Sequence, residues 1–457
     1  RSFISREFMG NHLGSIPVRV VTTIVILLLF AVGARGSVGR VPVRERNAAI
    51  TSDAFLNKTV LNPYTALRYA IREQIRLSRV SGLEIYLPDK DMCAAAQYAF
   101  STDRVFNDLD QYMITHAKGR KGDPPRHIFL VVAESYSAWP MWEQYHSLHI
   151  ADGVKGLARE GISFERFISS SGGTMSSLCS IVTGLPDAGI ITNYRQSARG
   201  AYPTSMGKIF KDLGYTTRFF YGGYLSWQRV GDFCKDQGFE EIYGGGDIGS
   251  WLSANEWGVD DEYLFDFVLK TVRDDTPSFN LILTTSYHPP YDIDVRAKGF
   301  SLTEIPQDLK SLCVEDVDLK MLGHFWYTDH YLGEFAKNIE RHLPKTLIAI
   351  TADNASRKKV VKNPGLFEKT AVPFVLYGKD VLDGIDVPDN ASGSHLDVIS
   401  TLVELAAPKG FTYHTMGKNL LDPDQRLTAI GQSLVLGPDY IADVRKEPKI
   451  YPLPGYG

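Results

Sequence analysis

Five polar residues follow apolar or glycine-rich segments, where enzymes built on α/β sheets keep their reactive groups. Glu134 ends the run HIFLVVAE, His288 closes LILTTSYH, and Asp353 with Asn354 closes LIAITADN. Thr174 follows Ser-Ser-Ser-Gly-Gly and opens a segment with a helical pattern. Each has a plain structural alternative as a helix cap, a turn or a surface charge. Taken together, they predict a metal site beside an activated hydroxyl.

The chemistry of such a set is coherent. A threonine hydroxyl is a weak nucleophile near neutral pH, and a divalent cation activates it. Glu134 and Asp353 supply the carboxylate oxygens that such a cation prefers. The helix start and the two glycines before Thr174 favour a bound anion, and His288 is placed to donate to the transferring group or the leaving oxygen. The predicted substrate is a phosphate or sulfate ester.

These residues need a sheet whose strand ends meet at one edge. The apolar runs predict strands at 127–133, 216–221, 279–285, 346–351 and 374–377. Helical patterns lie between and beyond them, in a stretch through residue 157 and at 175–182, 205–213, 258–273, 325–342 and 396–405. This alternation predicts an α/β fold with a largely parallel sheet sandwiched by helices, and a ligand at the carboxyl ends of the strands.

An uncharged segment spans residues 20–34 between Arg19 and Arg35. It is shorter than the roughly 20 residues that span a bilayer, but flanking arginines can extend the span. The segment predicts a membrane helix, with a cleaved signal peptide and a buried soluble helix as alternatives. A membrane helix and a signal peptide would both place the rest of the chain outside the cytoplasm.

Composition shifts divide the chain into four predicted segments. They are a membrane anchor at 1–36, a helical juxtamembrane linker at 37–123, a catalytic domain at 124–430 and a C-terminal extension at 431–457. The cluster GRKGDPP at 119–125 marks the main boundary. The helical run at 65–80 either lies along a membrane, covers the next domain or is a solvated linker.

The composition is that of a globular protein. The 457 residues are 44% hydrophobic and 22% charged, which argues against disorder. The formal charge is −4 and no basic block occurs, so nucleic acid is not a predicted partner. The four cysteines lie far apart, which predicts neither a zinc ribbon nor a dense disulfide framework.

The stretch Thr174–Gly184, TMSSLCSIVTG, resembles the sulfatase signature C-x-P-S-R-x-x-L-x-T-G. Ser177, Thr183 and Gly184 match it, whereas Thr174 replaces the cysteine that matures to formylglycine. A threonine here is similar to the lipoteichoic acid synthases and phosphoglycerol transferases of the alkaline phosphatase superfamily. The segment FLNKTVLNPYTALRYA resembles their post-membrane linker. The resemblance implies an alkaline phosphatase/sulfatase-like fold.

The resemblance also implies site residues. The family's metal ligands fall on Glu134, Thr174 and Asp353, and Asn354 stands where those relatives have histidine. Sulfatases use an Asp-Asn pair for calcium, so Asn354 is expected as a ligand. An oxygen-only set predicts one divalent cation, Mn²⁺ or Mg²⁺, with Ca²⁺ as a further candidate.

Head-group residues of the family resemble Trp227 and Arg229 in SWQRV, together with His288. An amphipathic helix is the structural alternative for the first two. His395, in GSHLDV, is expected either near the site or as a helix-capping residue.

The predicted protein is a membrane-anchored phosphoglycerol transferase, in the bacterial cell membrane with its catalytic domain on the extracytoplasmic side. Thr174 takes glycerophosphate from a phosphatidylglycerol-type lipid through a covalent intermediate and passes it to a hydroxyl of a glycan or teichoic-acid-type acceptor. A sulfatase-like phosphodiesterase or sulfuric ester hydrolase is the first alternative enzyme. A phosphoethanolamine transferase is the second, although the SWQRV match and the few cysteines disfavour it. An inactive membrane-tethered polymer-binding module is the alternative outside enzymes, and Asn354 is the feature that favours it.

Overall fold

The structure is a computed structural model that describes residues 16–36, 38, 54–79, 91–100, 102–120, 122–249, 257–358, 360–388, 391–425 and 427–453. It divides into two compact units, Arg1–Ser81 and Gly82–Gly457. The division into four segments made from the sequence stays a prediction.

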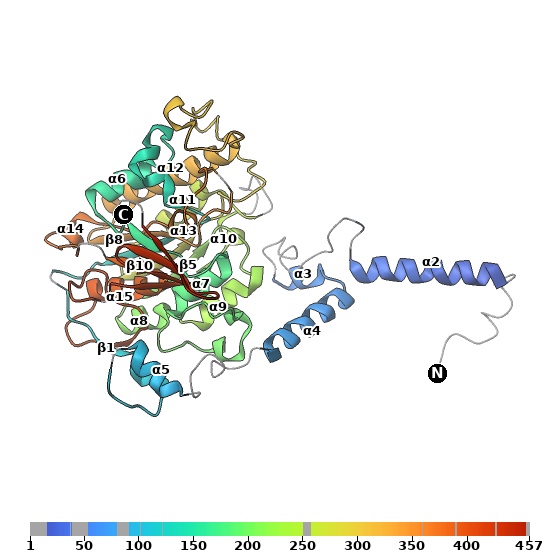
Figure 1. Cartoon of the computed structure of the whole chain (residues 1–457), viewed down its shortest axis with the longest axis horizontal. Coiled ribbons are helices and arrows are strands. Elements are labelled where there is room, and N and C mark those ends of the chain that lie inside the picture. The colour runs from blue at the N-terminus through green and yellow to red at the C-terminus, as the bar shows by residue number, and fades with distance from the viewer. Residues whose placement is uncertain are drawn as a thin grey trace. The chain divides into compact units, whose positions relative to one another are not determined.

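Three helices lie in the described part of the first unit (Figure 1): α2 (Ile16–Arg35), α3 (Ala54–Thr59) and α4 (Pro63–Arg79). The most apolar 18-residue window of α2 has a mean hydropathy of 2.4, and none of the residues of the helix is buried. At 1.5 Å per residue the helix is about 30 Å long, which matches the hydrocarbon thickness of a bilayer. Its length and composition fit a membrane span or a signal sequence, and its exposure does not fit a soluble core helix.

The second unit is built on a seven-stranded sheet with the order β3-β9-β8-β2-β7-β5-β6. The strands from β8 to β6 are parallel, and β9 is antiparallel to both of its neighbours. In sheet order the bounds are Ile162–Ser163, Val375–Tyr377, Thr346–Ala352, His127–Ala133, Ser278–Leu283, Thr216–Tyr221 and Glu241–Tyr243. The prediction of a largely parallel sheet is confirmed.

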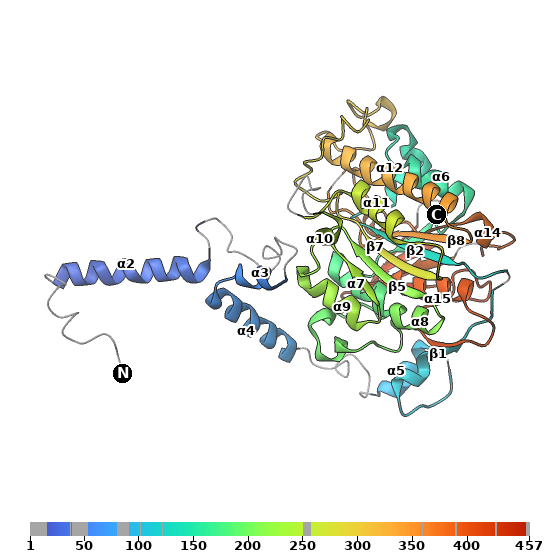
Figure 2. The ribbon, with the colours of Figure 1, turned by 180° about the vertical axis from the view of Figure 1, so that it is seen from behind.

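Helices cover both faces of this sheet (Figures 1 and 2). Phe129 of β2 meets Phe335 on one face, and Phe279 of β7 stacks on Phe210 at 4.0 Å between ring centroids on the other. Because both faces are covered, β2, β7 and β8 are buried along their whole length. One layer holds α6 (Asp152–Glu160), α11 (Asp261–Thr271) and α12 (Leu319–His342), and the other holds α7 (Thr174–Thr183), α8 (Met206–Asp212) and α15 (His395–Ala406).

One predicted helix is not continuous in the structure. The helical stretch expected between Glu134 and Leu157 is two 3₁₀ segments, η5 (Trp139–Met141) and η6 (Glu143–Leu148), followed by α6. Pro140 lies in the first segment, and His149 ends the second with a left-handed φ of 51°. Proline and a left-handed residue both interrupt an α-helix, so the expected helix forms only from Asp152 onward.

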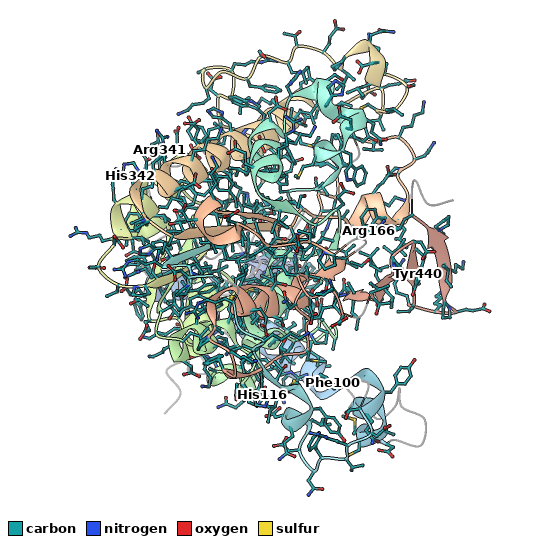
Figure 3. All side chains as sticks on the ribbon, turned by 90° about the vertical axis from the view of Figure 1, so that its left-hand side faces the viewer. Phe100, His116, Arg166, Arg341, His342 and Tyr440 are labelled. Carbon is teal, nitrogen blue, oxygen red and sulfur yellow. The ribbon has the colours of Figure 1, made fainter. Side chains whose placement is uncertain are left out.

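Smaller sheets attach to this core. β1 (Ile114–His116) pairs with β11 (Thr412–His414), and β12 to β15 form an antiparallel meander between Ala429 and Pro452. Figure 3 labels His116 in the first attachment and Tyr440 in the second. The parallel pair of β4 (Arg166–Ile168) with β10 (Ser392–Ser394) matters for the site, because each strand leads directly into a segment beside Thr174 or His395.

Candidate active site

Two adjacent parallel strands bring Glu134 and Asp353 to one sheet edge. Ala133 of β2 pairs with Ala352 of β8, and the next residue on each strand is the carboxylate. The Asp353 N–H donates to the Ala133 carbonyl at 3.2 Å, which extends the ladder by one step. Neighbouring strands lie about 4.8 Å apart, so the register fixes the two carboxylates beside each other.

Thr174 approaches this edge from the start of α7. Its Oγ1 donates to Glu134 Oε2 at 3.4 Å. Gly173 is the N-cap residue, and the Arg357 guanidinium donates to the Gly172 carbonyl. The first backbone N–H groups of a helix have no partner within the helix, so this end favours a negatively charged group. A hydroxyl, a carboxylate and a helix N-terminus therefore meet at one place.

Ser135 connects the two carboxylates, and the sequence reasoning missed it. Its N–H donates to Asp353 Oδ1 at 2.6 Å, and its Oγ donates to Glu134 Oε1 at 2.9 Å. Its φ is 52°, in the left-handed region that non-glycine residues rarely occupy. Such backbone outliers concentrate at functional sites. The only signal in the sequence is the position directly after Glu134.

Burial dominates the electrostatics of the pair. Burial, and then the charge of Asp353, hold the pKa of Glu134 well above its ordinary value. Burial raises the pKa of Asp353 to about 6, although the Thr174 hydroxyl and the Ser135 N–H lower it. Within the described ranges neither carboxylate belongs to an ion pair with a lysine, arginine or histidine. Two buried carboxylates without a counter-charge are the environment that a cation relieves.

The donor atoms fit a hard cation. Asn354 is buried, and its Nδ2 donates to Asp353 Oδ2 at 2.6 Å. The set therefore offers two carboxylates, one hydroxyl and one side-chain amide oxygen. No three His, Cys, Asp or Glu side chains converge anywhere in the part of the chain that the structure describes. Oxygen ligands of this kind suit Mg²⁺, Ca²⁺ or Mn²⁺.

The loop after β7 runs along the same edge and carries His288. The Thr284 hydroxyl accepts the Glu134 N–H at 3.0 Å. Asp261 accepts two backbone N–H groups of the next loop residues, at 3.0 and 3.1 Å, and thereby fixes the loop. His288 is half-buried, with Nδ1 2.7 Å from the Pro289 carbonyl oxygen and its ring 3.9 Å from that of Trp257. Its catalytic role stays a prediction.

Trp227 and Arg229 form a 3₁₀ turn, η9 (Trp227–Arg229), rather than an amphipathic helix. The Trp227 ring lies 6.2 Å from that of Tyr221 at the end of β5, and its buried Nε1 has no hydrogen-bond partner among the described residues. Arg229 donates to the Asn193 carbonyl at 2.8 Å and contacts Asp232 at 3.4 Å. Trp227 thus keeps a donor available, whereas two partners hold the Arg229 guanidinium.

His395 lies behind the edge and does not cap its helix. Ser394 is the N-cap of α15 and forms a capping box with Asp397. The buried His395 ring accepts the Ser170 N–H at Nδ1 (3.1 Å) and donates from Nε2 to the Ala352 carbonyl (2.8 Å). Burial lowers its pKa to about 3, so the ring is neutral. His395 therefore joins the segment before Thr174 to the strand before Asp353.

A mostly parallel sheet between helices, with polar groups at one strand edge, is an alkaline phosphatase/sulfatase-like fold. The chain belongs to the sulfatase family, whose family model matches residues 126–408. The resemblance drawn from TMSSLCSIVTG is confirmed at this level.

One curated relative is phosphoglycerol transferase I of Xanthomonas euvesicatoria pv. vesicatoria (strain 85-10). It is 24% identical over 311 residues, which are 63% of this chain and 42% of the relative. The chain thus spans less than half the length of that relative.

Solved structures share the fold. An alkaline phosphatase superfamily protein from Vibrio parahaemolyticus has a TM-score of 0.60 at 19% identity, over 80% of this chain and 91% of that one. The lipoteichoic acid synthase LtaP from Listeria monocytogenes has a TM-score of 0.60 at 17% identity, over 78% of this chain and 88% of that one. At these identities the likeness concerns the fold alone.

Proposed function

We propose that this protein is a membrane-anchored, extracytoplasmic phosphoglycerol transferase of the bacterial cell envelope that uses Thr174 as its nucleophile. The observation that carries the proposal is the Thr174 hydroxyl at a helix N-terminus, directed at one of two buried carboxylates. The relative in Xanthomonas supports glycerophosphate as the transferred group. Replacement of the sulfatase cysteine by threonine supports phosphoryl over sulfuryl transfer.

Glu134, Asp353, Thr174 and Asn354 would hold one divalent cation. When bound, such a cation supplies Lewis-acid chemistry that favours deprotonation of a nearby hydroxyl and offsets phosphate charge. Ser135 keeps both carboxylates in place through its N–H and its hydroxyl. The start of α7 provides backbone donors for the phosphate oxygens.

The proposed reaction has two balanced halves. Thr174 Oγ1 attacks the phosphorus of a phosphatidylglycerol-type donor and forms a new phosphorus–oxygen bond. The bond to the diacylglycerol oxygen breaks, and that oxygen takes up a proton while Thr174 loses one. An acceptor hydroxyl then attacks the same phosphorus and loses its proton, and Thr174 leaves and regains one. His288 is the proposed proton donor to the leaving oxygen.

The glycerol end of the donor would lie against Trp227. Its free Nε1 donor can bond a glycerol hydroxyl, and its ring forms an apolar wall beside Tyr221. Arg229 holds the turn to the loop after α7 through the Asn193 carbonyl. We therefore propose Trp227 as the head-group contact and Arg229 as a residue that positions it.

The acceptor would enter through a pocket of about 920 Å³ that adjoins the site. Gly172 and Asn354 line both the pocket and the catalytic edge. Gly172 is two residues from Thr174, so their Cα atoms lie within about 7.6 Å. Exposed cations on the pocket wall would bind an acceptor of negative charge; they are Arg357, Lys358, Lys362 and Lys369.

The test is incubation of the protein in lipid vesicles with phosphatidylglycerol labelled in its head group, plus Mn²⁺ or Mg²⁺ and a glycan acceptor. A transferase gives diacylglycerol and labelled acceptor. Label found only as free glycerophosphate would replace the transferase with a phosphodiesterase, which membership of the sulfatase family also allows. No turnover and no bound metal would favour the polymer-binding module.

A further inference from the structure

The first unit carries a feature that transfer chemistry does not explain. Four apolar side chains of α4 are exposed on one side of the helix: Tyr64 (56% exposed), Leu67 (59%), Ile71 (51%) and Ile75 (44%). Their spacing of three and four residues puts them in one stripe. A stripe of this kind normally packs against a core, and exposing it to water is unfavourable.

Hydrogen bonds fix the start of α4 to the end of α2. Asn62 caps α4 by accepting the Thr65 N–H at 2.9 Å, and its Nδ2 donates to the Gly33 carbonyl at 2.9 Å. The Thr65 hydroxyl donates to the Ala34 carbonyl at 3.1 Å. The rings of Phe30 and Tyr64 meet edge to face at 5.2 Å. The stripe therefore begins where the apolar helix ends.

Positively charged side chains lie beside the apolar stripe. Arg68 and Arg72 are exposed and follow Leu67 and Ile71 by one residue each. One residue turns a helix by about 100°, so the two arginines lie along one border of the apolar stripe. An apolar stripe with flanking arginines is the pattern of helices that lie in a membrane interface, where the cations meet lipid phosphates. Tyr64 at the start suits the same boundary.

We propose that α4 lies in the surface of a phospholipid bilayer that contains anionic lipid, with Leu67 and Ile71 toward the acyl chains and Arg68 and Arg72 at the head groups. This assignment rests on the proposed span by α2 and is independent of catalysis. Of the three alternatives for the helical run at 65–80, the proposal selects the membrane. The bilayer surface, rather than a protein, is the occupant of the stripe.

The test maps the depth of single fluorescent labels in the full chain. Cysteine is introduced at Leu67, Ile71 or Ala66 in a Cys93→Ser background, since the other three native cysteines are buried. A label at Leu28, in the middle of α2, reports insertion. Each variant is reconstituted in vesicles of phosphatidylcholine and phosphatidylglycerol that contain lipids spin-labelled on the acyl chain.

Labels at Leu67 and Ile71 should be quenched at least about twofold more than the label at Ala66, because an interfacial helix sinks its apolar face roughly 5–10 Å. Replacing phosphatidylglycerol by phosphatidylcholine should reduce the difference in quenching between the two apolar positions and Ala66. Equal quenching at all three positions overturns the proposal. So does protection from aqueous iodide without lipid quenching, which means that protein covers the stripe. No quenching at Leu28 overturns the membrane span itself, and Thr174→Ala should change none of these readings.

Discussion

At the scale of single residues, the site depends on two carboxylates that the fold forces together. Glu134 and Asp353 follow paired alanines in adjacent parallel strands, and Ser135 bonds to both. Burial raises the pKa of each. This arrangement is costly without a cation, so a bound metal ion would compete with protons for the same oxygens.

We expect metal affinity to rise with pH through about 6. Asp353 has its pKa raised to about 6, and its proton must leave before a cation binds. The stability of the metal-free protein should change with pH in the opposite direction. A carboxyl group with a raised folded-state pKa stabilises the protonated, metal-free fold, so in chelator the melting temperature should fall as pH rises from about 4 toward 7.

Calorimetric titration with Mn²⁺ and thermal unfolding with and without chelator measure both trends. Asn354→Ala should weaken metal binding less than Asp353→Asn does, because Asp353→Asn removes a charge. The loss of metal affinity in Asp353→Asn should exceed about 10-fold, the lower end of the range for lost groups that support a metal site. Binding that does not change between pH 5 and 8 would argue against this assignment of ligands.

At the scale of elements, His395 links the segment before Thr174 to the strand before Asp353. We expect His395→Leu to lower stability by about 2–5 kcal/mol, because two buried backbone groups lose their partners. Turnover and metal affinity of this variant should fall together with its stability. His127→Leu is the matched control, since that buried histidine also bonds through both nitrogens but lies at the opposite end of β2.

The same histidine predicts a pH dependence. Its folded-state pKa of about 3 lies below the ordinary 6.5, so the unfolded chain binds more protons between these values. The His395 contribution is complete above pH 6.5 and declines toward pH 3, by at most about 1.4 kcal/mol per pH unit. Chemical denaturation of wild type and His395→Leu across this range measures the difference in slope. Parallel slopes would contradict a buried, neutral ring.

The loop after Asp353 gives a third prediction. Lys358→Glu with Lys362→Glu should raise the KM for an anionic acceptor by about 10-fold or more, as two charged contacts of about 1 kcal/mol or more each are lost. Release of diacylglycerol in the first half-reaction should be unchanged. Lys270→Glu with Lys337→Glu, on α11 and α12, is a control with the same change of charge outside the pocket. An equal rise in KM in the pocket variant and in the control variant would show that the total charge of the protein is responsible.

The sequence predicted the elements that depend on local pattern. β2 and β8 are apolar runs of seven residues, and their ends identified Glu134 and Asp353 directly. The contacts that the sequence did not predict join residues that lie far apart along the chain. The left-handed Ser135 is held by Asp353, and the two bonds of His395 come from Ser170 and Ala352. No periodicity in the chain encodes such contacts, because they exist only once the sheet has formed.

At the scale of the whole molecule, the chain combines an apolar helix with a sulfatase-family enzyme unit. We expect the protein made in bacteria to stay in the membrane fraction after carbonate washing and to retain α2, because its 20 residues match the bilayer core. The intact mass of the membrane-extracted protein checks this. A mature chain that begins after residue 34, found in the soluble fraction, would mean that the segment is a signal peptide.

The central claim is that Thr174 carries glycerophosphate between donor and acceptor. The most direct measurement is mass spectrometry of protein that has been incubated with phosphatidylglycerol and a divalent cation, then quenched in acid without acceptor. The account predicts a mass gain of about 154 Da on the peptide that contains Thr174, the covalent product of the first half-reaction. The gain should be absent in Thr174→Ala and should disappear when acceptor is added. An adduct on Ser176 or Ser177, or diacylglycerol released at the wild-type rate by Thr174→Ala, would contradict it.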